Sequence, residues 1–191
     1  MFAPMICKPL VLLSAALFLF GTQAHTQQTG GRFRSAALFT GIGFELNQPD
    51  RYSPVYLAAD LSWQFGRTPR KDFLAFYLEP QFNPVLTTRP LDIEFGCNIG
   101  LRYYQRLTPR LLLYEMIGSG PHYITAELPS QANGFIFSDN AAIGIYVQPK
   151  PDKPFFWNFQ VRFRHLSNAS LKRPNSGVDN INLILGLGKI R

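Results

Sequence analysis

The sequence predicts an all-β protein, an eight-stranded antiparallel transmembrane β-barrel of the bacterial outer membrane. Three observations predict it. The chain starts with an export signal, the remainder divides into eight segments of alternating apolar and polar residues, and most segments are long enough to cross a bilayer as tilted strands. An even number of such strands is typical of outer-membrane barrels, and eight is the smallest number in that series.

The first 24 residues have the pattern of a secretory signal peptide. Lys8 supplies the positive charge, residues 9–20 form an apolar stretch, and Thr22-Gln23-Ala24 matches a small-residue cleavage site. The apolar stretch is shorter than the roughly 20 residues that a transmembrane helix needs. We therefore expect residues 1–24 to be removed and residues 25–191 to form the barrel domain. An uncleaved anchor is the alternative.

Eight segments are expected to form the strands, because Pro, Gly, Asn and Asp clusters separate them. The expected strands are Arg32–Phe44, Ser53–Phe65, Phe73–Val85, Leu91–Leu107, Leu111–Tyr123, Gly134–Gln148, Phe155–Ser167 and Asp179–Lys189. If the first strand starts on the periplasmic side, the connections after the first, third, fifth and seventh strands face outside. Thr108-Pro109-Arg110 is then a short periplasmic turn, as this class of barrel requires.

The seventh segment shows the alternation most clearly. Its apolar face consists of Trp157, Phe159, Val161 and Phe163. Its polar face consists of Asn158, Gln160, Arg162 and Arg164. A soluble barrel turns the apolar face inward, whereas a membrane barrel turns it toward lipid. The many aromatic residues, 17 Phe and 8 Tyr, favour lipid because aromatic girdles mark both membrane interfaces.

Acidic and basic residues also occur within the strands. Because the interior of a membrane barrel is polar, these residues are expected to face the lumen and form ion pairs there. The expected pairs join Glu79, Glu94 or Glu115 to Arg102, Arg162 or Arg164. His122 is expected to have a packing role.

The composition argues against several other classes of protein. A share of 14% aromatic residues argues against disorder and against a coiled coil. The net charge is +7, but no run of Lys and Arg forms a nucleic-acid-binding tail, so no nucleic-acid partner is expected. Cys97 has no cysteine partner once the segment that holds Cys7 is removed, and no Cys/His cluster has metal-ligand spacing. We expect neither a metal nor a cofactor.

Three residues around the last connection have the types that a serine hydrolase uses. His165 and Ser167 are two residues apart on a strand, so both side chains lie on the face of the apolar stripe. Asp179 starts the next strand in phase with its apolar residues, and the two strands should pair antiparallel. A histidine can take the serine proton, and a carboxylate can then stabilise the imidazolium. Asn168 or nearby backbone N–H groups are candidate donors to the oxyanion.

The same three residue types also occur together on ordinary solvated loops. A lipid-facing position favours catalysis over that alternative, because polar side chains facing lipid are costly unless they are functional.

The segment reads His165-Leu166-Ser167-Asn168-Ala169, then Pro174-Asn175-Ser176-Gly177, then Asp179. It resembles the signature of PagL-type lipid A 3-O-deacylases, which is His-x-Ser-Asn-Ala, then Pro-Asn-x-Gly, then an acid. The resemblance implies an eight-stranded outer-membrane barrel with a Ser-His-Glu triad on its lipid-facing surface. By resemblance His165 is the base, Ser167 the nucleophile and Asn168 the oxyanion donor. Asp179 departs from the family pattern, because the best-known members have Glu there.

The resemblance also implies the reaction and the substrate. We expect hydrolysis of the ester-linked 3-hydroxyacyl chain at position 3 of lipid A, the lipid of lipopolysaccharide in the outer leaflet. Arg51, Lys172 and Arg173 are expected to bind its phosphates through charge-assisted contacts. The alternatives are a catalytically silent barrel with a structural or adhesion role, a secreted lipocalin-like binder, and a barrel acyltransferase. The sequence leaves open whether the protein forms a homodimer.

Overall fold

A computed structural model describes residues 33–46, 52–65, 71–87 and 91–190. The predicted signal peptide lies outside these residues. No helix in the described part of the chain is long and apolar enough to cross a membrane.

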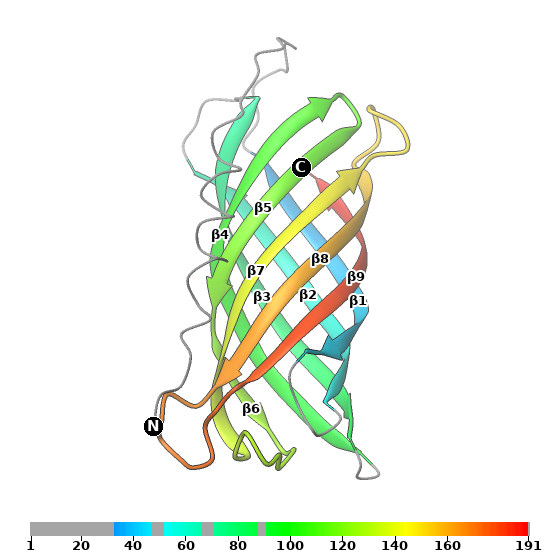
Figure 1. Cartoon of the computed structure of the whole chain (residues 1–191). Helices are drawn as coiled ribbons and strands as arrows, with labels where there is room; N and C mark the ends of the chain where they lie inside the picture. Colours follow the sequence, from blue (N-terminus) through cyan, green and yellow to red (C-terminus); the bar gives the residue numbers. More distant parts are fainter. Residues whose placement is uncertain (1–32, 47–51, 66–70, 88–90, 191) are drawn as a thin grey trace.

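Nine strands form one closed antiparallel sheet (Figure 1). They are β1 (Arg34–Glu45), β2 (Ser53–Gln64), β3 (Asp72–Leu86), β4 (Asp92–Thr108), β5 (Leu111–Ser119), β6 (Pro121–Ile124), β7 (Gly134–Val147), β8 (Phe155–Ser167) and β9 (Val178–Ile190). Because β5 and β6 both pair with β4 and β7, they form one transmembrane segment in two parts. The pairing of β3 with β4 closes the sheet, so the structure is the predicted eight-stranded barrel.

The sequence did not predict the interruption between β5 and β6. At this point the chain passes very close to β4, because a Cβ atom added to Gly120 would lie 1.9 Å from the carbonyl oxygen of Cys97. Pro121, which begins β6, has no N–H to donate to a neighbouring strand, so the hydrogen-bond ladder is interrupted here although the register on β4 and β7 continues unchanged. The other predicted strand ends differ from the observed ones by one or two residues at most.

The barrel has apolar side chains outside and polar side chains inside along its middle. On β8, Phe159 and Val161 are 49% and 53% exposed, whereas Gln160 and Arg162, which alternate with them, are buried. Aromatic residues on the outer face lie near both ends of the barrel. Trp63 stacks on Phe76 near one end, and Phe95 stacks on Tyr123 near the other. This arrangement is the reverse of a soluble barrel and is typical of a bilayer-spanning one.

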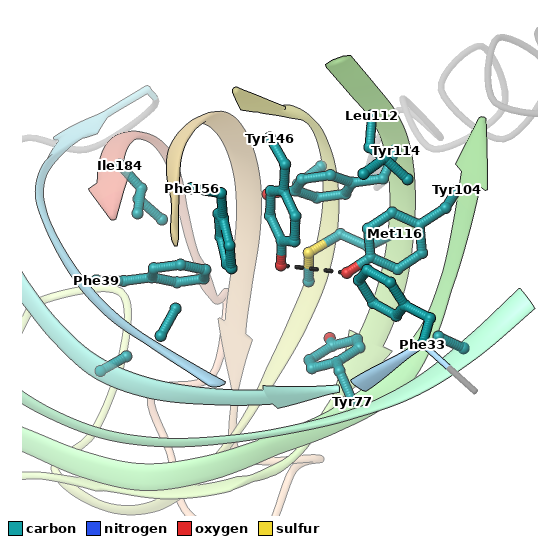
Figure 2. Close-up of a cluster of buried hydrophobic side chains, with 14 of the residues drawn as sticks. Phe33, Phe39, Tyr77, Tyr104, Leu112, Tyr114, Met116, Tyr146, Phe156 and Ile184 are labelled. Atoms are coloured by element: carbon teal, nitrogen blue, oxygen red, sulfur yellow. Dashed lines mark hydrogen bonds between the residues drawn. The ribbon is translucent and has the colours of Figure 1, made fainter. Parts of the chain in front are cut away.

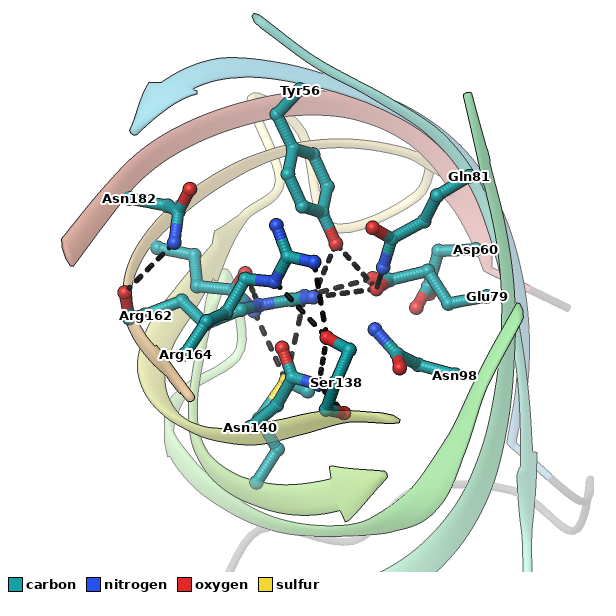
Figure 3. Close-up of polar contacts among 12 residues, drawn as sticks. Tyr56, Asp60, Glu79, Gln81, Asn98, Ser138, Asn140, Arg162, Arg164 and Asn182 are labelled. Carbon is teal, nitrogen blue, oxygen red and sulfur yellow. Dashed lines mark hydrogen bonds and ion pairs between the residues drawn. The ribbon is translucent and has the colours of Figure 1, made fainter. Parts of the chain in front are cut away.

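Side chains fill the lumen in two zones. One zone is a cluster of buried aromatic rings in which the hydroxyl groups of Tyr104 and Tyr146 are hydrogen bonded at 3.1 Å (Figure 2). The other is a polar network in which Arg162 pairs with Glu79 at 2.6 Å (Figure 3). In the same network Arg164 pairs with Glu94. These two pairs are among those that the sequence predicts. The buried His122 belongs to the same network, because its Nδ1 lies 2.7 Å from Oε1 of Glu94.

Two details of the predicted lumen are different in the structure. Glu115 faces outward, because it is in phase with the outward-facing residues Leu113 and Ile117 of β5. Arg102 pairs instead with Asp60, at 2.7 Å, and both side chains are fully buried.

The C-terminal ends of β1, β3, β6 and β8 lie at one end of the barrel, which we call the long-loop end; it is at the bottom of Figure 1. A small cluster of buried apolar side chains fills the lumen there. It consists of Tyr52, Val85, Ile124, Ala126, Leu128, Ile136, Leu166 and Val178. Loops 125–133 and 168–177 are joined by backbone hydrogen bonds from Ala132 N to Pro174 O at 2.9 Å and from Ser176 N to Ser130 O at 2.7 Å. These contacts fix the loop that follows Ser167.

Candidate active site on the outer wall

The register of β8 and β9 places His165 directly opposite Asp179. Nδ1 of His165 and Oδ1 of Asp179 are 2.6 Å apart, and the two side chains are 37% and 30% exposed on the outer wall. A bond from Nδ1–H to a carboxylate fixes the tautomer and leaves Nε2 as a proton acceptor. The predicted His–acid pair is therefore formed, and it lies on the wall of the barrel that faces lipid.

Ser167 follows His165 on the same outward face and lies opposite Phe137 of β7. Its hydroxyl has no hydrogen-bond partner among the described residues, so the structure does not join it to His165. In substrate-free enzymes such catalytic contacts are often long and shorten only when substrate binds. The three predicted residues therefore lie in one patch, but no hydrogen bond joins Ser167 to His165 in this structure.

Asn168 is buried, and its donors contact the loop that it begins. Its backbone N–H donates to Oδ1 of Asn175 at 2.7 Å, and its Nδ2 donates to the carbonyl oxygen of Lys172 at 2.7 Å. The next two residues, Ala169 and Ser170, have φ angles of 51° and 65°, so the chain turns sharply here. Because an amide group carries two protons, Nδ2 retains one besides the proton given to Lys172.

The structure describes two of the three predicted phosphate-binding residues. Lys172 and Arg173 are exposed in loop 168–177, and Nζ of Lys172 donates to Oδ1 of Asn133 at 2.6 Å. The loop therefore presents two cations at the rim next to Ser167. Arg51 lies outside the described residues.

Gly177 makes room for the imidazole of His165. Its φ angle is +80°, and a Cβ atom added to it would lie 2.4 Å from Cε1 and 3.0 Å from Nε2 of His165. The first contact is not sterically allowed and the second is tight, so a larger residue would displace the ring. The sequence gives Pro174-Asn175-Ser176-Gly177 as part of the family signature, and the structure adds that its glycine leaves the space in which the imidazole of His165 lies.

We expect Gly177→Ala to lower kcat by about 100-fold, since a displacement of about 1 Å at a reacting group has an effect of that size. Gly134→Ala is the matched control, because Gly134 also has a positive φ of +107° but its added Cβ would meet nothing within 4 Å. Both variants carry backbone strain, so only Gly177→Ala should lose activity in folded protein. Equal activities of the two variants would contradict the account.

Sequence reasoning missed two polar residues of the same wall. Asp139 of β7 lies opposite His165 on the side away from Asp179, and it faces outward. The hydroxyl of Ser119 on β5 donates to Oδ1 of Asp139 at 2.6 Å. A polar row therefore crosses four neighbouring segments. An acidic residue in phase with the apolar outward residues Phe135 and Phe137 was the signal that could have found it.

The next row away from the long-loop end is apolar, and its residues pair in sequence across the same strands. These residues are Ile117, Ala141, Phe163 and Ile181. The polar row is therefore bordered directly by apolar residues of the outer wall.

The model of the PagL family, lipid A 3-O-deacylase, matches residues 50–188 of this chain. The chain belongs to the PagL family. The match includes His165, Ser167 and Asp179, and together with the closed barrel it identifies the protein as a lipid A deacylase of the bacterial outer membrane. A search of curated protein sequences finds no match.

Solved structures support the fold. The outer membrane enzyme PagL is 16% identical with a TM-score of 0.58, and the match covers 80% of this chain and 97% of that one. Ail, the attachment invasion locus protein of Yersinia pestis, is 12% identical with a TM-score of 0.56, covering 85% and 100%. Neisserial surface protein A is 9% identical with a TM-score of 0.50, covering 85% and 99%. At these sequence identities the solved structures support only the fold, and the function is assigned from the match to the PagL family model.

Proposed function

We propose that this member of the PagL family hydrolyses the ester-linked 3-hydroxyacyl chain at position 3 of lipid A by a Ser-His-Asp mechanism. The observation that carries the proposal is the 2.6 Å contact between His165 and Asp179 on the outer wall, with Ser167 on the same face. A catalytic pair at this place meets its substrate from within the membrane, where the acyl chains of lipid A lie.

The proposed reaction has two steps. Ser167 Oγ attacks the ester carbonyl carbon while Nε2 of His165 takes its proton, and Asp179 stabilises the imidazolium. The sugar oxygen leaves with the proton from His165, and the acyl chain stays on Ser167 as an ester. A water molecule, deprotonated by His165, then attacks the acyl-enzyme and releases the 3-hydroxy fatty acid.

The oxyanion that forms in both steps requires a hydrogen-bond donor. We propose that the remaining Nδ2 proton of Asn168 is that donor, since Asn168 follows the nucleophile directly and Lys172 takes one proton of its amide. Every replacement of this amide also removes its bond to the Lys172 carbonyl oxygen, so Asn168→Asp is compared with Asn175→Ala, which removes the other bond between Asn168 and the loop. The Asp side chain keeps the size of the Asn side chain but removes the amide donor, so we expect kcat to fall by about 100-fold or more. An unchanged kcat would remove Asn168 from this role.

A fluorophosphonate, which phosphonylates activated serine hydroxyl groups with loss of fluoride, tests the proposed nucleophile. We expect the detergent-purified full chain to be labelled at Ser167, and His165→Asn to be labelled much more slowly because Nε2 no longer accepts the proton. Label on another serine, or no label in a preparation that deacylates lipid A, would contradict the mechanism.

Lys172 and Arg173 are proposed to bind the phosphates of lipid A, together with Arg51. We expect the double variant Lys172→Ala/Arg173→Ala to raise KM for lipid A by about tenfold, in line with the loss of one charge-assisted contact. Cleavage of a small uncharged ester should stay unchanged, since it brings no phosphate. Equal losses with both substrates would assign the two residues to the loop structure instead.

A further inference from the structure

We propose that Asp139, oriented by Ser119, accepts a hydrogen bond from the hydroxyl on the third carbon of the acyl chain being cleaved. The residue would then make the site selective for 3-hydroxyacyl esters over unsubstituted acyl esters. The inference rests on the proposed function and names a specificity-determining residue for that reaction.

The position of Asp139 has no structural explanation in the barrel. Its neighbours along β7, Ser138 and Asn140, point into the lumen, where they lie close to Arg164 (Figure 3). Asp139 points the other way, onto the outer wall, between the outward-facing residues Phe137 and Ala141. The arginines of the lumen therefore do not face it. A carboxylate facing lipid without a cation is costly, which favours a functional role.

Only one oxygen of Asp139 has a partner among the described residues. Oδ1 accepts the hydroxyl of Ser119 at 2.6 Å, which fixes the orientation of the carboxylate. Oδ2 remains for another donor. Asp139 is not needed as the acid for His165, because Nδ1 of His165 already contacts Asp179 at 2.6 Å.

The register places Asp139 within reach of a substrate held at Ser167. Ser167 pairs with Phe137 and His165 pairs with Asp139, so Ser167 and Asp139 are diagonal neighbours on one face. Such neighbours have Cα atoms about 7–8 Å apart, and their side chains come closer. In a 3-hydroxyacyl ester, the hydroxyl-bearing carbon is two carbon–carbon bonds from the carbonyl carbon that Ser167 attacks. That hydroxyl therefore lies between the two side chains.

The chemistry selects a hydroxyl as the group that Asp139 binds. An ionised carboxylate only accepts hydrogen bonds, so it requires a donor on the substrate. The ester group has acceptors alone. The hydroxyl on the acyl chain is a donor that moves with the scissile ester, and an unsubstituted chain would leave the carboxylate without a partner.

The test compares two esters of the same chain length, the nitrophenyl esters of 3-hydroxymyristate and of myristate, with the full chain in detergent. We expect the wild type to have a kcat/KM about 10- to 100-fold higher for the hydroxy ester, as a hydrogen bond to a charged group contributes. Asp139→Ala should bring this ratio close to one by slowing the hydroxy ester alone. Ser119→Ala should lower the ratio in the same direction but less.

Glu115→Ala is the matched control. It also removes an outward-facing carboxylate, but this one lies on β5, away from Ser167, so the ratio should stay unchanged. The mobility of unheated protein in gels confirms that each variant is folded. A ratio unaffected by Asp139→Ala, or equal loss on both esters, would overturn the inference while the proposed function stands. A wild type that cleaves neither these esters nor lipid A would overturn the proposed function as well.

Discussion

Ser167→Ala is expected to lower kcat for lipid A deacylation by about 10⁶-fold, because loss of the nucleophile of a serine hydrolase has an effect of that size. His165→Asn should be comparable, since the serine and its base act as a unit and their effects are not additive. The Ser167 hydroxyl has no hydrogen-bond partner among the described residues, so its removal should leave the barrel intact.

The loop offers a control for Ser167→Ala. Ser176 is an exposed serine in loop 168–177, and its backbone N–H, rather than its hydroxyl, makes the contact to loop 125–133. Ser176→Ala should therefore retain full activity. Activity of the double variant Ser167→Ala/His165→Asn within tenfold of the wild type would exclude both residues as the catalytic pair.

Asp179→Asn is expected to lower kcat by about 10⁴-fold, because an amide in this position favours the wrong imidazole tautomer. The register lets the short side chain of Asp179 reach His165. Asp179 lies directly opposite His165, and the Cβ atoms of such pairs are about 4.5–5.5 Å apart, which the short side chain spans with a contact of 2.6 Å.

Asp179→Glu tests the same geometry from the other direction. Its carboxylate has one extra methylene to accommodate, so we expect kcat to fall by about tenfold, much less than in Asp179→Asn, where the charge is lost. A Glu variant as inactive as Asp179→Asn would show that position matters more than charge. An Asn variant with full activity would remove Asp179 from the mechanism.

The sequence predicted the barrel well because its strands carry a strict two-residue pattern. The observed β8 has the predicted bounds, Phe155–Ser167, and its polar and apolar faces are those read from the alternation. The His165–Asp179 contact was also predictable, since a single connection joins two strands that must pair as neighbours. In both cases the local periodicity, together with the direct connection between consecutive strands, determines which side chains meet.

Features that depend on the exact register between two strands were not predictable. The pairing of Asp139 with His165 requires the offset of β7 against β8, which no local pattern gives. The bonds of Asn168 and the space that Gly177 leaves for the imidazole depend on how loop 168–177 folds back over β8.

The most direct test of the central claim follows the mass of purified lipid A during incubation with the detergent-purified protein, with Ser167→Ala alongside. The account predicts loss of one ester-linked 3-hydroxyacyl group, release of the free 3-hydroxy fatty acid, and no change with the variant. An unchanged lipid A mass with folded wild-type protein would contradict the account and favour a catalytically silent barrel. Transfer of the acyl group to another lipid would instead indicate an acyltransferase.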